Sequence, residues 1–87
     1  MPTTFQASRA EALFVSSVQS SESPTVTQVR TAVAVTLRKL GTRGCAAQVA
    51  SEFGDHPETA VTRMIWALAT VRTVYPATAP AALTLAA

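Results

Sequence analysis

The stretch from residue 44 to residue 73 constrains the fold most, because two helical patterns meet there at helix-breaking residues. Before the break, apolar residues recur at three- and four-residue intervals, as one buried face of a helix requires. Gly54 predicts the end of this helix, since glycine adopts the left-handed conformation that closes a helix at little cost. Pro57 favours the start of a second helix, because its missing N–H would be unpaired in the first turn. We therefore expect two helices that meet at a sharp corner, the first with this buried face: Ala46, Val49, Ala50 and Phe53.

The helix expected after Pro57 has two contrasting sides. Apolar residues recur at helical intervals on one side, which we expect to be core: Val61, Met64, Ile65, Leu68 and Val71. The other side should face outward, although it holds the only tryptophan of the chain: Thr59, Thr62, Arg63, Trp66, Thr70 and Thr73. A partner or a further helix is therefore expected against that side.

These residues resemble the helix-turn-helix of transcriptional regulators over roughly residues 45–73. That family has a small residue in its first helix, here Ala50, and a glycine four residues later, here Gly54. The resemblance implies a DNA-binding regulator whose second helix enters the major groove of duplex DNA. It also implies base-facing residues on that helix, of which the arginine suits a bidentate contact to guanine. These residues are Thr59, Thr62, Arg63 and Trp66.

Arg38, Lys39 and Arg43 form a compact basic cluster just before this stretch, around a loop expected from Gly41 to Gly44. Under the DNA-binding hypothesis they contact phosphates and fix the position of the protein on the duplex. Arg38 and Lys39 also lie in the last turn of a predicted helix, where they stabilise its negative end, so both explanations stay open. Carboxylates around the corner oppose phosphate binding: Glu52, Asp55 and Glu58.

Two helices are expected before this cluster. Residues 8–11 match a capping box, which predicts a helix start at Ser8 with Leu13 and Phe14 on its inner side. A serine-rich connector follows at residues 16–23. Residues 25–28 repeat the capping arrangement and predict a second helix up to a glycine. Its apolar side comprises Val26, Val29, Val33, Leu37 and Leu40.

Leu13 and Phe14 also support a different function. If the core were complete without them, they and Trp66 would be exposed anchors for another protein. The chain would then be a small non-enzymatic helical interaction module, acting as an adaptor or a homodimer. A third possibility is that Leu13 and Phe14 cover Trp66 within the core.

Length and composition restrict the architecture. At 87 residues the chain can hold one small domain. We expect a flexible N-terminus at residues 1–7, a single helical domain at residues 8–75 and a disordered tail rich in Ala and Pro at residues 76–87. The alanine-rich composition resembles that of high-GC actinobacteria. Because alanine supplies little side-chain volume, the core should be thin and gain from dimerisation, so a homodimer is expected. The predicted fold is all-α, a three- or four-helix bundle with a centre like a helix-turn-helix.

Other classes of function have little support in the residues. Cys45 is the only cysteine, so no intramolecular disulfide can form, and we expect this side chain to be buried. His56 is the only histidine, and no nucleophile–base pair, phosphate-binding loop or metal-ligand spacing accompanies it. We therefore expect no enzymatic activity, metal, cofactor or small-molecule substrate. The chain has neither an apolar run long enough for a bilayer nor a signal-peptide pattern, so we expect a cytoplasmic location.

Overall fold

The computed structural model of the protein describes residues 4–76 and is all-α over that range, as predicted. Its elements are α1 (Thr4–Val15), the short 3-10 turn η1 (Ser20–Glu22), α2 (Val26–Asp55) and α3 (Pro57–Val74). Over residues 4–76, none of the helices combines the length and the apolar character that a bilayer span needs. The tail predicted to be disordered lies, apart from Pro76, outside the described residues.

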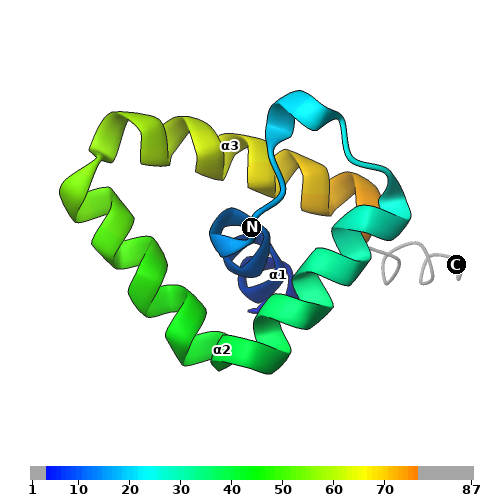
Figure 1. Ribbon diagram of the computed structural model, residues 1–87, viewed down its shortest axis with the longest axis horizontal. Coiled ribbons are helices and arrows are strands. Elements are labelled where there is room, and N and C mark those ends of the chain that lie inside the picture. The colour runs from blue at the N-terminus through cyan, green and yellow to red at the C-terminus, as the bar shows by residue number, and fades with distance from the viewer. Residues whose placement is uncertain (1–3, 77–87) are drawn as a thin grey trace, which may run out of the picture.

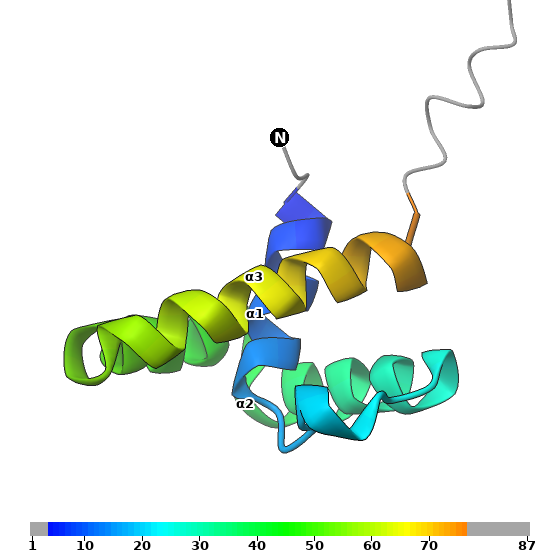
Figure 2. The same ribbon diagram turned by 90° about the horizontal axis from the view of Figure 1, so that it is seen from above.

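The N-terminal helix α1 lies at the centre of the molecule. Figure 1 shows that α2 bends near its middle, so that its two halves and α3 form the three sides of a triangle. α1 passes through this triangle, and Figure 2 shows that it runs across α3. Leu13 and Phe14 are at most 5% exposed, which confirms that they dock on the core. The alternative in which they anchor another protein is therefore wrong.

α1 begins at Thr4, a full turn before the predicted start at Ser8, and the flexibility predicted for residues 4–7 is also wrong. Contacts with the end of α3 hold the additional turn. The Gln6 side chain donates from Nε2 to the carbonyl oxygen of Tyr75 at 2.8 Å, and the guanidinium carbon of Arg9 lies 4.1 Å from the centre of the Tyr75 ring. Tertiary contacts of this kind override a local capping signal.

The start of α2 follows the predicted capping box. Thr25 donates its N–H to Gln28 Oε1 at 2.8 Å, and Gln28 donates its N–H to Thr25 Oγ1 at 3.1 Å. Both bonds satisfy backbone donors that the first turn leaves unpaired.

The bend in α2 is made by one residue. Only Gly41 leaves the helical conformation, at φ 72° and ψ 171°, and the helix resumes at once. The loop predicted from Gly41 to Gly44 is therefore wrong. This backbone conformation is essentially restricted to glycine, so a single Gly41 suffices to redirect the helix.

α2 and α3 meet at His56. Gly54 remains helical, so the predicted left-handed conformation is wrong, whereas His56 breaks the helix at φ −139° and ψ 65°. His56 precedes Pro57, whose ring disfavours the helical conformation in the residue before it. The predicted corner between two helices is therefore confirmed, but the proline sets its position.

The predicted inner side of α3 is confirmed in part, since Val71 is buried and Met64 and Leu68 are partly buried against the core. Its buried residues are Ala60, Ala67, Val71 and Val74. Val61 and Ile65 are instead 48% and 63% exposed. On α2 the core residues Val29, Val33, Cys45 and Val49 are buried, while Val26, Ala46 and Ala50 of the predicted inner faces are exposed.

Candidate interaction surface

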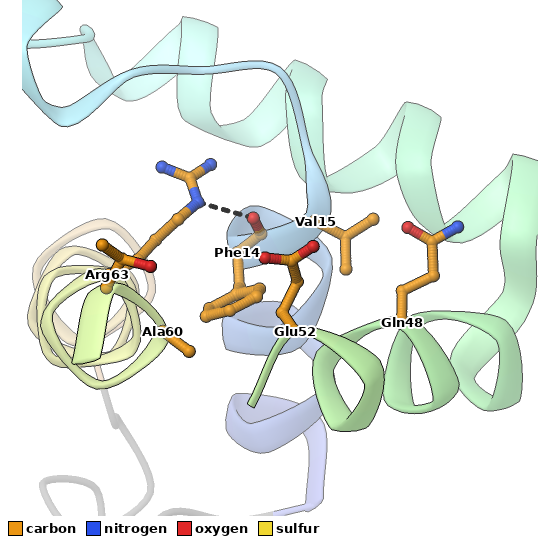
Figure 3. Close-up of a pocket in the computed structure, with 7 residues that line it drawn as sticks. Phe14, Val15, Gln48, Glu52, Ala60 and Arg63 are labelled. Atoms are coloured by element: carbon orange, nitrogen blue, oxygen red, sulfur yellow. Dashed lines mark hydrogen bonds between the residues drawn. The ribbon is translucent and has the colours of Figure 1, made fainter. Parts of the chain in front are cut away.

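Arg63 connects α3 to the end of α1. Its Nε donates to the carbonyl oxygen of Phe14 at 2.7 Å, a bond drawn in Figure 3. Its Nη2 lies within 3.2 Å of three more carbonyl oxygens, those of Leu13, Ser16 and Val18. The last carbonyls of a helix have no partner within it and form its negative end, so a guanidinium suits them by geometry and by charge. Desolvation by burial lowers the pKa of Arg63 from its ordinary value.

These bonds remove Arg63 from the outer surface. The expectation that Arg63 faces outward is therefore wrong, because its Nε and Nη2 donate to backbone carbonyls of the same molecule, while the contact of Arg63 with guanine stays a prediction. No feature near Arg63 in the sequence signals this role, since its acceptors lie 45 to 50 residues earlier in the chain.

Trp66 is half-buried and packs on the hydrophobic core. The guanidinium carbon of Arg63 lies 5.0 Å from the Trp66 ring, within the range of a cation–π contact. The indole thus forms part of the support beneath α3. The outward position expected for Trp66 is therefore only partly confirmed, and its contact with DNA or a partner stays a prediction.

Thr59 and Thr62 are exposed, as predicted. Their hydroxyls donate to carbonyl oxygens of the preceding turn, those of His56 at 3.2 Å and Glu58 at 3.3 Å. These bonds fix the side chains against α3.

The basic cluster of Arg38, Lys39 and Arg43 is exposed and lies around the bend of α2. In Figure 1 this bend forms the corner of the triangle opposite α3. The structure therefore does not bring the cluster together with Thr59 and Thr62, which the DNA-binding hypothesis places on one surface.

A small hollow lies between the end of α1, the second half of α2 and the start of α3 (Figure 3). Its volume is about 190 Å³, below the usual size of a ligand pocket, and the Arg63 guanidinium at its rim is already bonded to α1. Its lining offers a carboxylate and an amide and no nucleophile paired with a base. The lining residues are Phe14, Val15, Gln48, Glu52, Thr59, Ala60 and Arg63.

The residues that can carry metal or thiol chemistry do not gather into a site. Within the described part of the chain, no three His, Cys, Asp or Glu side chains are placed to hold a metal ion. Cys45 is buried, as predicted, and its pKa is raised by desolvation and also by the charge of Glu11. A buried thiol with a raised pKa is a poor nucleophile.

The exposed side of α3 carries two of the exposed large apolar side chains of the described residues. We name it the outer face, and it comprises Glu58, Val61, Thr62, Ile65, Ala69 and Arg72. Figure 2 shows α3 crossing in front of α1, with no other described helix covering it on that side. Val61 and Ile65 lie four residues apart and therefore adjoin on the helix surface. They form a short apolar stripe that the sequence pattern assigns to the core.

Comparison of the chain with protein-family models, with curated proteins and with solved structures found no match. Its function has to be inferred from the surface chemistry of the described residues.

Proposed function

We propose that the protein is a non-enzymatic helical module that binds another protein through the outer face of α3. The observation that carries this proposal is the exposure of Val61 and Ile65, at 48% and 63%, on a helix whose opposite side already fills the core. A single exposed apolar side chain is ordinary, whereas adjacent branched residues at a four-residue spacing form the kind of stripe by which helices dock on partners.

The contacts that hold α3 against the rest of the molecule also favour binding through Val61 and Ile65. Arg63 fixes α3 to the end of α1 and to the segment after it through four carbonyl contacts, and Trp66 of α3 packs against the core. A surface that is rigid before binding loses little conformational entropy in a complex. Leu13 and Phe14, which were to anchor a partner only if the core were complete without them, lie within the core instead.

A photo-crosslinking residue placed at position 65 tests this proposal in cells that make the protein. The crosslinking residue at position 65 should yield covalent adducts with a protein, because this position lies in the middle of the outer face. The matched control places the same residue at Ala47, which is exposed on α2. Absence of adducts from position 65, or equal adducts from both positions, overturns the proposal.

A second candidate, a DNA-binding regulator, is favoured by one observation, the exposure of Arg38, Lys39 and Arg43 around one bend. These side chains are free to contact phosphates at the corner opposite α3. If all three do so, affinity for duplex DNA should fall by about 40-fold between about 50 mM and 200 mM salt. Replacing the three residues with alanine should remove most of that dependence, and an affinity insensitive to both changes contradicts this candidate.

A further inference from the structure

We propose that the partner of the outer face is a second copy of this chain, with the two α3 helices antiparallel and a two-fold axis passing beside Ile65. This inference rests on the proposed function and gives the docking surface one occupant. It is carried by the order of residues along the outer face. When two such faces meet in opposite directions, each charged residue lies opposite a residue of the other charge.

The charges at the two ends of the face establish the direction. Glu58 lies seven residues before Ile65 and Arg72 lies seven residues after it. Seven residues are close to two helical turns, so the three side chains lie nearly in one line, about 21 Å from end to end. All three are exposed, and within residues 4–76 neither the Glu58 carboxylate nor the Arg72 guanidinium has an ion-pair partner.

Antiparallel pairing about Ile65 places each Glu58 opposite an Arg72 and forms two ion pairs. Parallel pairing would place Glu58 against Glu58 and Arg72 against Arg72, with repulsion at both ends. Exposed ion pairs add little affinity, but opposed like charges strongly disfavour an arrangement. The charges therefore select the antiparallel dimer.

The middle of the face is matched in size and in polarity. The two-fold operation places Ile65 against itself and Val61 against Ala69, a branched side chain against a small one. Between Glu58 and Arg72 the only charged residue of α3 is Arg63, which is bonded to α1. The contact is thus an apolar strip with complementary charges at its ends, as a closed two-fold interface requires.

The length of this contact limits its strength. A pair of helices in contact over about 21 Å buries an area at the low end of specific interfaces, so we expect a dissociation constant on the order of micromolar. The dimer should therefore dissociate on dilution.

Charge reversal tests the pairing in sedimentation equilibrium measurements over a range of concentrations. The unmodified chain should dimerise, and Glu58→Arg and Arg72→Glu should each be monomeric, because each change opposes like charges at both ends. The double variant carrying both changes should dimerise again. Ile65→Lys, which places two cations at the two-fold axis, should weaken the dimer by about 100-fold or more.

Two controls separate loss of pairing from loss of folding. Arg38→Glu makes the same charge change at an exposed position on α2 and should leave the dimer intact. Far-ultraviolet circular dichroism should show that every variant keeps its helical content.

The outcomes also separate this inference from the proposed function. A chain that is monomeric at all concentrations, or a dimer insensitive to charge reversal, overturns the antiparallel pairing. If position 65 nevertheless crosslinks to a different protein, the docking function of the face stands and only its occupant is wrong. If position 65 crosslinks to no protein, both proposals fall.

Discussion

At the scale of the residue, Arg63 is the side chain that the sequence describes least well. Its place among threonines and beside Trp66 predicts exposure, and nothing nearby signals that its partners are carbonyls at the end of α1. The sequence cannot show that Arg63 turns toward the core, because it does not show which backbone carbonyls will lie within reach of the guanidinium. Cys45 shows the opposite case, because a lone cysteine beside alanines correctly predicts a small buried residue.

Arg63→Met should destabilise the protein by about 2–4 kcal/mol, because the carbonyl oxygens of Phe14, Ser16 and Val18 lose the donor that Arg63 gives them. Arg63→Lys should lose less, since it keeps the charge but cannot reproduce the fork of donors. Urea unfolding measures both. The control Arg43→Met alters an exposed arginine and should change stability by no more than about 0.5 kcal/mol. Equal stabilities for Arg63→Met and Arg43→Met would show that the four carbonyl contacts contribute nothing.

The buried thiol of Cys45 gives a pH dependence of stability. Its pKa is raised in the folded state, by desolvation first and by Glu11 second, so the folded protein holds the proton more tightly than the unfolded chain. This contribution to stability is complete below the ordinary pKa of a thiol and is lost as pH rises through the folded pKa. Unfolding in urea at a series of alkaline pH values should show the decline, and Cys45→Ala should reduce it. An identical alkaline decline in Cys45→Ala assigns the effect to other groups.

At the scale of the element, local signals predict where helices begin better than which side they bury. The capping box of Thr25 and Gln28 and the start at Pro57 are confirmed because they depend on neighbours in sequence. The inner side of α3 is predicted only in part: Val71 is buried as expected, but Ala60 and Ala67 give a weak apolar signal, whereas the exposed Val61 and Ile65 give a strong one. Alanines permit close packing against α1, and this depends on the shape of the partner helix.

Gly41→Ala and Gly54→Ala should change the stability of the protein in opposite directions. Gly41→Ala forces a side chain into a conformation that alanine avoids, although nothing lies within 4 Å of the new Cβ. We expect a loss of about 1–3 kcal/mol from backbone strain. Gly54→Ala adds a Cβ into open space within a helix and should gain about 0.5–1 kcal/mol. Thermal and urea unfolding measure both, and a neutral Gly41→Ala would mean that the bend can straighten.

At the scale of the whole molecule, the arrangement depends on α1. The sequence predicts that Leu13 and Phe14 lie on the inner side of this helix, but it gives no sign that the helix is central. In the structure α1 lies at the centre of a triangle formed by α2 and α3, and its Leu13 and Phe14 are buried. Such an arrangement cannot be predicted from periodicity, because it depends on where Gly41 and His56 redirect the chain.

A chain that lacks residues 1–17 should fail to fold, because the remaining helices lose the surface against which each of them packs. Circular dichroism of this fragment should show little helix and no cooperative thermal transition. Addition of a peptide of residues 1–17 should restore helical signal, and the same peptide with Leu13→Asp should not. A cooperative transition in the fragment alone would show that α1 is dispensable.

The carbonyl oxygens to which Arg63 donates lie at the end of α1 and in the segment just after it, 45 to 50 residues earlier in the chain. During translation, α1 therefore leaves the ribosome well before the arginine that fixes its end. The nascent polypeptide carries Leu13 and Phe14 without their cover until α3 has been made. Completion of the fold thus follows synthesis, and the growing chain is most exposed to aggregation or proteolysis through its own first helix.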